Sequence, residues 1–212
     1  MKKQVSKSHY SFQYYVTRER WNSYYCQIDE VMKCKGKNVL YIGVGDSIVV
    51  DTLKKFGKNV KVLDFEKDFK PDYLGSVTEI DQVLGKDKSR FDIVVCSQVL
   101  EHIPFEQFEP TVEKISKYAK EKFILSIPNR SIWIRFRLPI IHGFKIKIKR
   151  PFDKKWDIED QGCGEHYWEI DAVGCPKKKD ICAIVQKYFQ LERTYTLYEN
   201  PYHTFFILKK KR

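Results

Sequence analysis

The sequence predicts an α/β domain with a doubly wound, mostly parallel seven-stranded sheet that ends in an antiparallel hairpin. Short apolar runs alternate with segments of helical periodicity over residues 38–127, as they do in βαβ units. The first run ends in two closely spaced glycines and the second ends in a carboxylate. The last two runs are separated by residues 199–203 only, and so short a connection makes them antiparallel.

The first strand and helix have clear end signals. A strand is expected at 38–42 and a helix at 46–56. Asp46 or Ser47 is the expected N-cap residue, since short polar side chains accept hydrogen bonds from the first turn. Gly57 stands where a helix commonly ends in a left-handed residue.

The second strand, at 60–64, completes a unit that predicts a nucleotide site. Gly43 and Gly45 allow a backbone to approach a ligand without interference from Cβ atoms. Asp64 ends the second strand, where a carboxylate can accept hydrogen bonds from both ribose hydroxyls. We therefore expect an adenosine-containing cofactor. The glycine pattern is incomplete, because position 48 is Ile, so a plain strand-to-helix turn remains the alternative.

The alternation continues through the next three strands. The apolar run of the fourth strand is continuous, which is typical of a strand covered on both faces. The elements expected in order are a strand at 72–77, a helix at 78–84, a strand at 91–97, a helix at 105–122 and a strand at 123–127.

Residues 129–175 break the alternation, and we interpret them as an inserted, substrate-facing lobe. Within the lobe, residues 144–149 alternate apolar and basic side chains, as a strand with one solvated basic face would. The regular pattern then resumes. A helix is expected at 176–188, with Pro176 in its first turn, followed by strands at 189–198 and 204–208.

The chain as a whole, residues 1–212, is expected to be a single domain with an N-terminal helical extension at 1–35. Over residues 10–33 the aromatic and apolar side chains recur every three or four positions, which predicts one amphipathic helix packed on the domain. The alternative is that this helix covers a ligand pocket. The expected buried stripe is Tyr14, Tyr15, Arg18, Trp21, Asn22, Tyr25, Ile28, Val31 and Met32.

The composition, with 42% hydrophobic and 32% charged residues, is that of a soluble globular protein. The first ten residues lack the apolar core of a signal peptide, and no apolar stretch is long enough to span a bilayer. A cytoplasmic location follows as the expectation. Because no secretory signal is recognised, the six cysteines are expected to be reduced thiols. None of them forms a C-x-x-C pair, so we expect no metal site.

The formal net charge of +11 is concentrated at 135–155 and at 209–212. Such basic segments favour anionic partners, here an anionic membrane surface or nucleic acid. The alternative is that the lysines only keep the protein soluble. No obligate protein partner is expected.

The glycine turn, Asp64 and the run Phe91-Asp-Ile-Val-Val-Cys-Ser-Gln-Val-Leu-Glu-His-Ile-Pro104 together resemble the class I S-adenosylmethionine-dependent methyltransferases. The resemblance covers roughly residues 36–128 and is most specific at Gln98–Pro104, which is similar to the segment after strand four of the small-molecule enzymes. It implies a Rossmann-like methyltransferase fold and S-adenosylmethionine as the cofactor.

The resemblance also implies roles for individual residues. Gly43 and Gly45 would lie beneath the methionine part of the cofactor, Asp64 would bind the ribose, and Phe65 would lie beside the adenine. The full set implied for the cofactor is Tyr41, Gly43, Gly45, Asp46, Asp64, Phe65, Ser76, Val77, Ser97 and Gln98.

Three positions depart from the family pattern. Tyr41 stands where the family usually has an acid that holds the cofactor's amino group. Ser47 replaces a frequent third glycine, and Ser76 replaces an acid near the adenine. These departures leave the expected fold unchanged and bear on the affinity for the cofactor.

Methyl transfer needs a general base only when the nucleophile must lose a proton. The candidates at the carboxyl edge of the expected sheet are His102, Glu101 and His166, with His203 and Glu165 as further possibilities. The expected substrate is a small molecule, a saccharide or a lipid-linked compound. Two alternatives stay open: a catalytically inactive binding protein with this fold, and an RNA methyltransferase.

Overall fold

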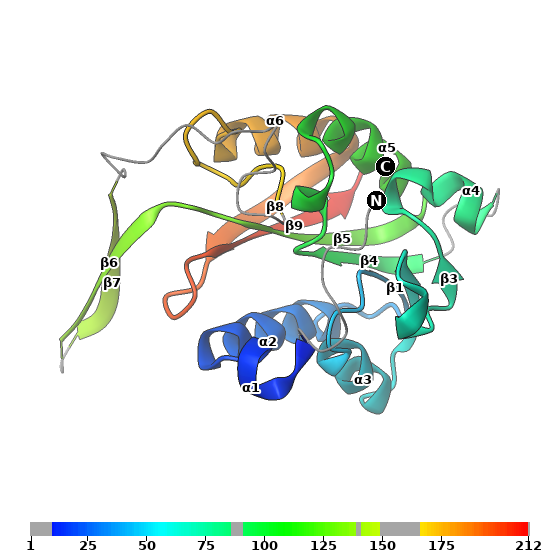
Figure 1. The fold of residues 1–212 in the computed structure, drawn as a ribbon, viewed down its shortest axis with the longest axis horizontal. Helices are drawn as coiled ribbons and strands as arrows, with labels where there is room; N and C mark the ends of the chain where they lie inside the picture. Colours follow the sequence, from blue (N-terminus) through cyan, green and yellow to red (C-terminus); the bar gives the residue numbers. More distant parts are fainter. Residues whose placement is uncertain (1–9, 86–90, 139–140, 149–165, 212) are drawn as a thin grey trace.

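The computed structural model describes residues 10–85, 91–138, 141–148 and 166–211. In these ranges the chain forms a seven-stranded sheet and a separate two-stranded hairpin, with helices on both faces of the larger sheet (Figure 1). The order across the larger sheet is β3-β2-β1-β4-β5-β9-β8. The strands are β1 (Asn38–Ile42), β2 (Asn59–Asp64), β3 (Tyr73–Leu74), β4 (Phe91–Ser97), β5 (Ala119–Pro128), β8 (Phe189–Thr196) and β9 (His203–Lys210).

Strand directions confirm the predicted fold class. The strands from β3 to β5 pair in parallel, whereas β9 is antiparallel to both β5 and β8. The strand order reverses between β1 and β4. In open α/β sheets a ligand crevice forms at such a reversal, beyond the carboxyl ends of the strands. The topology therefore directs attention to the loops that follow β1, β2 and β4.

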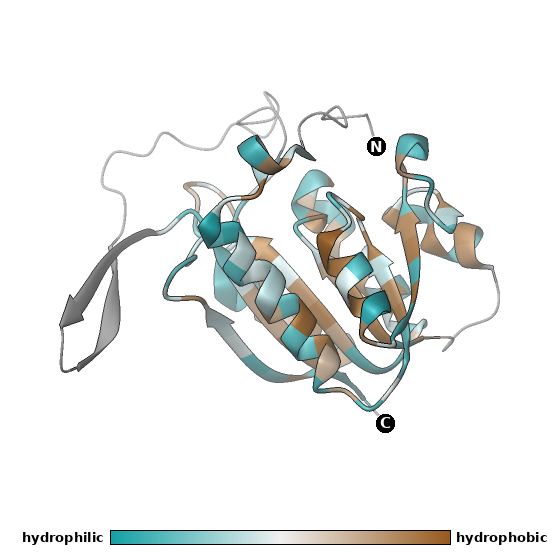
Figure 2. Ribbon diagram, turned by 90° about the horizontal axis from the view of Figure 1, so that it is seen from below, coloured by the Kyte–Doolittle hydropathy of each residue, from teal (hydrophilic) through white to brown (hydrophobic). Residues whose placement is uncertain are grey.

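Helices cover the sheet on both faces, and the strand sequences reflect this. Alternate residues of β1 enter different cores: Val39 and Tyr41 pack on one side, and Leu40 and Ile42 on the other. Because both faces are covered, β1 and β4 need continuous apolar runs. One face carries α1 (Phe12–Tyr15), α2 (Arg18–Met32) and α3 (Ile48–Lys55), and the other carries α4 (Ile80–Leu84), α5 (Phe108–Ser116) and α6 (Lys178–Tyr188). Figure 2 shows the hydrophobic strands behind the more hydrophilic helices of the first face.

The single helix predicted at 10–33 is wrong, because α1 and α2 are separate. The Thr17 hydroxyl accepts a hydrogen bond from the Arg20 amide at 3.2 Å and so caps a new helix. The predicted buried stripe is also largely wrong: Trp21 is 50% exposed and Tyr25 is 65% exposed. The buried face instead mixes polar with apolar side chains, which a search for hydrophobic periodicity does not detect. Its residues are Ser23, Tyr24, Gln27, Glu30 and Val31.

The helix predicted at 105–122 ends earlier than expected. A short 3₁₀ turn precedes α5, which stops at Ser116, and β5 begins at Ala119. Ala119 pairs with Phe91 of β4, so sheet pairing takes over a segment whose periodicity is helical. In the same way β3 contains two residues, where the sequence suggests a strand at 72–77.

Within residues 129–175, β6 (Ile132–Leu138) and β7 (Ile141–Ile148) form a hairpin that projects away from the main sheet (Figure 1). The alternating segment predicted as a strand does lie in β7. Part of the basic 135–155 segment and the candidate Glu165 lie outside the described residues. Among the helices that the structure describes, none combines the length and the apolar character needed to cross a bilayer.

Candidate functional site

A cavity of about 380 Å³ lies at the strand-order reversal, beyond the carboxyl ends of β1, β2 and β4. The loops after these strands form its floor, and residues of α1 and α2 also line it. The N-terminal segment therefore borders a pocket, in agreement with the alternative weighed for it. The lining of the cavity includes Tyr15, Arg20, Tyr24, Gln27, Tyr41, Gly43, Gly45, Asp46, Asp64, Phe65, Phe69, Val77, Ser97, Gln98, Val99, His102, His166, Tyr202 and His203.

The glycine turn after β1 has a conformation that requires glycine. Gly43 has φ +81°, and a Cβ atom there would lie 2.4 Å from Cγ2 of Val99. Gly45 is also left-handed, with φ +57°. Ser47 has φ +66°, which explains why a third glycine is frequent at this position in the family that the sequence resembles. Ser47 is the N-cap residue of α3, one of the two predicted, but its hydroxyl bonds the Asp51 carboxylate at 2.6 Å. The side chain that accepts a hydrogen bond from the start of the helix is Asp46, the other candidate: its Oδ1 accepts one from the Ile48 amide at 3.2 Å.

Asp64 is buried at the tip of β2 and faces the cavity. One carboxylate oxygen accepts a hydrogen bond from the Val44 amide, and the other accepts one from the Glu66 amide, both at 2.8 Å. Burial nevertheless raises the pKa of this carboxyl above its usual value. Because each carboxylate oxygen has two lone pairs, both retain the capacity to accept a further hydrogen bond from a ligand.

The wall next to Asp64 is mainly apolar. Phe65, Phe69 and Val77 line it. Ser76, predicted to lie at the adenine edge, does not line the cavity. Its hydroxyl accepts a hydrogen bond from the Thr78 amide at 3.2 Å and so caps the following 3₁₀ turn. The residues on either side of it, Gly75 and Val77, line the cavity instead.

A set of polar side chains, here called the polar group of α2 and β1, forms another part of the wall. Its members are Arg20, Tyr24 and Gln27 of α2, Tyr41 of β1 and Asp46 of the loop after β1. Tyr41 is buried and donates a hydrogen bond to Oε1 of Gln27. Tyr24 donates one to Oδ2 of Asp46. The Arg20 guanidinium lies 3.8 Å from the ring centroid of Tyr15. Sequence reasoning missed Arg20, Tyr24 and Gln27, because only the packing of α2 on the sheet turns them toward the cavity.

The end of β4 supplies the next pair of predicted residues. Ser97 and Gln98 both contact Ser126 of β5: the two serine hydroxyls are 2.6 Å apart, and Nε2 of Gln98 donates to the same hydroxyl at 3.1 Å. Gln98 has φ +56°, so the chain turns sharply out of the sheet. This turn leads directly to Glu101 and His102.

The three predicted catalytic residues come together at the cavity. The rings of His102 and His166 meet edge to face, with centroids 4.8 Å apart. Glu101 is fully buried beside them, and burial raises its pKa to about 7. Within the described residues neither of its carboxylate oxygens has a hydrogen-bond partner. One potential ligand atom from each side chain lies within 4.8 Å of the others.

Two further residues hold this cluster and were missed by the sequence analysis. Nδ1 of His166 bonds Oε1 of Glu169 at 2.8 Å, and the Tyr202 hydroxyl donates to the same oxygen at 2.7 Å. The Tyr167 amide donates to the Glu101 carbonyl at 2.9 Å, which fastens the end of the 129–175 segment to the loop after β4. The sequence signal that was available is the spacing alone, a glutamate three residues after a histidine.

His203, a further candidate, is buried and also lines the cavity. Burial lowers its pKa to about 3, so it is neutral at ordinary pH.

No protein-family model matches this sequence. A ubiquinone biosynthesis O-methyltransferase of Coxiella burnetii is 32% identical over 91 residues, and the match covers 38% of this chain and 38% of that protein. Among solved structures, the CcbJ methyltransferase of Streptomyces caelestis has a TM-score of 0.62 at 12% identity, covering 92% of this chain and 97% of its own. The N-methyltransferase NodS of Bradyrhizobium japonicum, solved with S-adenosyl-L-homocysteine, has a TM-score of 0.60 at 9% identity, covering 92% and 89%.

Proposed function

We propose that this chain, which has the fold of the class I S-adenosylmethionine-dependent methyltransferases, binds S-adenosylmethionine and transfers its methyl group to a small molecule. One observation carries the proposal. The cavity at the strand-order reversal has the buried Asp64 carboxylate in one wall and the polar group of α2 and β1 in another. An adenosine joined to an amino acid needs a site of this kind.

In the proposed complex Asp64 accepts hydrogen bonds from the ribose hydroxyls with its remaining lone pairs. The adenine lies against Phe65, Phe69 and Val77, because this wall is apolar. The amino acid lies over the glycine turn, whose residues Gly43 and Gly45 line the cavity without side chains.

The polar group of α2 and β1 supplies partners for the amino acid end. Asp46 and the Gln27 carbonyl accept hydrogen bonds from its ammonium group, and the Arg20 guanidinium pairs with its carboxylate. Tyr41 holds Gln27 in place by a hydrogen bond. In this chain Gln27 and Asp46 therefore take the role of the acid that the family usually has at position 41.

The bound cofactor supplies an electrophilic methyl group on a sulfonium, which an in-line nucleophile can take. The protein then has to position the acceptor atom and receive its proton. His102 and His166 line the cavity and are the proposed proton acceptors, with Glu169 orienting His166. Glu101, which is buried beside the two rings, is the third candidate for accepting this proton.

We propose further that the acceptor enters beside residues 129–175, since this segment contributes His166 and Glu169 to the cluster. Small-molecule, saccharide and lipid-linked acceptors are all compatible with a site of this kind. The hairpin β6–β7 belongs to the same segment and overlaps the basic 135–155 stretch, which supports an anionic surface as a possible partner.

Calorimetric titration with S-adenosylmethionine and S-adenosylhomocysteine tests the proposed function. We expect Asp64→Asn to weaken binding about 10- to 100-fold, because hydrogen bonds to a charged group contribute roughly 1.5–3 kcal/mol. Asp72→Asn is the matched control: this aspartate also accepts a backbone hydrogen bond, from Val62 at 2.9 Å, but lies outside the cavity. It should leave the affinity unchanged.

The outcomes separate the alternatives. No binding at millimolar ligand, or equal losses in both variants, would remove the cofactor from the proposal and favour a binding protein that kept only the fold. Binding without turnover on any small-molecule acceptor would direct the search to RNA, which a salt-dependent gel shift would detect. Cosedimentation with anionic but not neutral vesicles would support the lipid-linked class.

A further inference from the structure

We propose that Glu101, His102 and His166 bind a divalent transition-metal ion at the wall of the cavity. This site replaces the expectation, drawn from the cysteines alone, that the chain has no metal ligands. Binding of the ion does not depend on the proposed methyl transfer, and the two can be tested separately.

The donor set and its geometry support the proposal. Two imidazoles and one carboxylate are common protein ligands of Zn²⁺, Mn²⁺, Fe²⁺ and Co²⁺. Their potential ligand atoms lie within 4.8 Å of one another. Ligand bonds of about 2.1 Å place the atoms of a tetrahedral site about 3.4 Å apart, so the three side chains would have to close in by roughly an ångström.

The burial of the Glu101 carboxylate without hydrogen-bond partners is the observation that points to a cation. This side chain is fully buried, and both carboxylate oxygens lack hydrogen-bond partners in the described structure. Glu169, the other buried carboxylate of the cluster, also has one described oxygen, Oε2, without a hydrogen-bond partner. No lysine or arginine of the described ranges forms an ion pair with either one. A bound cation would neutralise this pair of buried acids.

The surroundings of His166 also resemble those of a metal ligand. A ligating histidine usually donates the proton of its second nitrogen to a carboxylate, which fixes the ring and its tautomer. Nδ1 of His166 bonds Glu169 at 2.8 Å, and Glu169 is itself held by the Tyr202 hydroxyl. This arrangement assigns the proton to Nδ1 and metal ligation to Nε2.

Three protein ligands leave coordination positions for other molecules. Because His102 and His166 line the cavity, these positions face it, and an oxygen of a bound molecule can occupy one. A cation lowers the pKa of a hydroxyl bound to it. The acceptor class that fits is therefore a hydroxyl compound, whose proton passes to solvent because the two histidines then act as ligands and not as proton acceptors; this extension rests on the proposed function.

Metal titration of the purified full chain, after dialysis against EDTA and removal of the chelator, tests the proposal. We expect one Co²⁺ per chain, with visible absorption bands that lack the intense thiolate charge-transfer band of cysteine ligation, and displacement by Zn²⁺. Glu101→Gln and His166→Asn should each weaken binding at least about 100-fold. Glu169→Gln should weaken it roughly 10- to 100-fold, as changes to outer-sphere partners of a metal site do.

Glu109→Gln, which changes a described carboxylate of α5 outside the cluster, is the matched control and should leave the Co²⁺ affinity and spectrum unchanged. Circular dichroism of each variant shows whether it is folded. If Glu101→Gln fails to fold, the wild-type spectrum and the Glu169→Gln variant still decide the matter. No binding of Co²⁺, Mn²⁺ or Zn²⁺ at 1 mM (about 4 kcal/mol or less of binding energy) would overturn the proposal, as would a cobalt spectrum dominated by thiolate bands.

The same samples distinguish this proposal from the proposed function. Titration of the metal-free protein with S-adenosylmethionine reports the cofactor site alone, since Asp64 lies outside the metal cluster. Metal binding without cofactor binding would leave the metal site standing and remove the methyltransferase proposal. The reverse result would leave the cofactor site and return His102 and His166 to the role of proton acceptors.

Discussion

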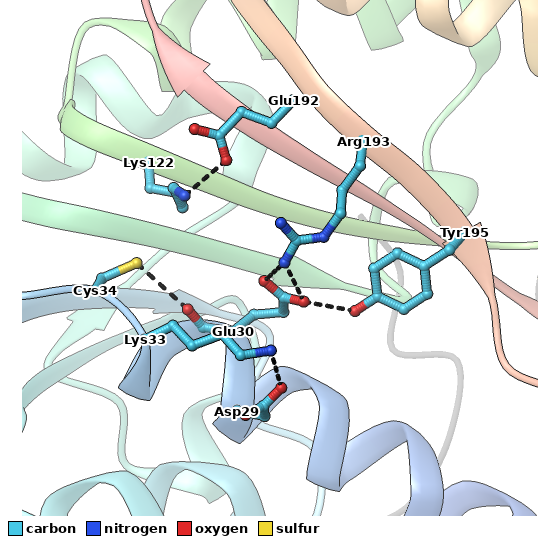
Figure 3. A network of polar contacts seen from close by, with 8 residues as sticks. All are labelled: Asp29, Glu30, Lys33, Cys34, Lys122, Glu192, Arg193 and Tyr195. Atoms are coloured by element: carbon cyan, nitrogen blue, oxygen red, sulfur yellow. Dashed lines mark hydrogen bonds and ion pairs between the residues drawn. The ribbon is translucent and has the colours of Figure 1, made fainter.

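A polar network that joins α2 to β8 should control how firmly α2, which lines the cavity, is held against the sheet. Glu30 of α2 receives two hydrogen bonds from the Arg193 guanidinium, at 2.7 and 2.5 Å, and one from the Tyr195 hydroxyl, at 2.9 Å (Figure 3). The Glu30 side chain is 5% exposed, whereas that of Arg193 is 46% exposed. The carboxylate is thus nearly inaccessible to solvent, whereas the guanidinium that pairs with it is about half exposed.

Replacing Arg193 with Met removes the cation and leaves Glu30 buried with Tyr195 alone. Breaking a fully buried ion pair in this way costs about 3–5 kcal/mol. Because solvent screens the half-exposed guanidinium, we expect a smaller loss, about 2 kcal/mol in the free energy of unfolding. For a domain of this size that corresponds to a decrease of roughly 4–8 °C in Tm.

A double-mutant cycle in urea, followed by circular dichroism, isolates the interaction. Glu30→Gln alone should cost about 1 kcal/mol, and with Arg193→Met the total should fall short of the sum by about 1 kcal/mol. Lys122→Met is the control: it breaks the 2.7 Å pair with Glu192 at the edge of the same region, and about 0.5 kcal/mol is expected. A coupling energy below about 0.3 kcal/mol would refute the reasoning.

The network also bears on ligand binding. The segment it fastens carries Tyr24 and Gln27, which line the cavity. A loosened α2 would have to be ordered again when a ligand binds, so Arg193→Met should weaken S-adenosylmethionine binding a few-fold, although Arg193 does not line the cavity.

Three further predictions follow from single positions. Gly43→Ala should destabilise the chain by about 2 kcal/mol in urea and abolish cofactor binding, because the new Cβ would lie 2.4 Å from Val99 and the backbone is left-handed; a loss below about 0.5 kcal/mol would contradict this. Tyr25→Ser, on the exposed face of α2, should change the free energy of unfolding by less than about 0.5 kcal/mol. Tyr24→Phe, which removes the hydrogen bond to Asp46, should cost about 1 kcal/mol. Equal effects of the two variants would contradict the assignment of the exposed and buried faces. Burial lowers the pKa of His203 to about 3, so below pH 6.5 the unfolded chain binds a proton that the folded chain does not. The free energy of unfolding should therefore fall as the pH decreases from 6.5, by up to about 1.4 kcal/mol per pH unit. An equally steep slope in His203→Gln would assign the effect to other groups.

The sequence was sufficient wherever the determining interactions are local. β1 and β4 have the predicted bounds, and Gly57, which follows α3, has the left-handed backbone expected there. Asp64 follows from the same logic, because a carboxylate at the tip of a parallel strand must reach the ligand edge of the sheet. These features can be predicted from apolar runs, glycines and turn residues, which are local patterns in the sequence.

The site itself was only partly predictable. Glu101 and His102 could be placed at the edge because they follow β4, and His166 was a candidate next to the inserted segment. Their contact, and its support by Glu169 and Tyr202, depends on how the end of residues 129–175 folds back onto the loop after β4. Pairing between positions so distant in the sequence leaves no periodic signal.

By itself, then, the sequence determined the bounds of β1 and β4, the glycine turn and the carboxylate that faces the cavity, because these depend on residues close together along the chain. Only the tertiary structure decided which face of α2 is buried, where α5 gives way to β5, and which polar side chains gather at the cavity. The physical reason is the same in each case. Glu30 is buried because Arg193 and Tyr195 bond it, and Ala119 is a strand residue because it pairs with Phe91, and both partners come from distant parts of the chain.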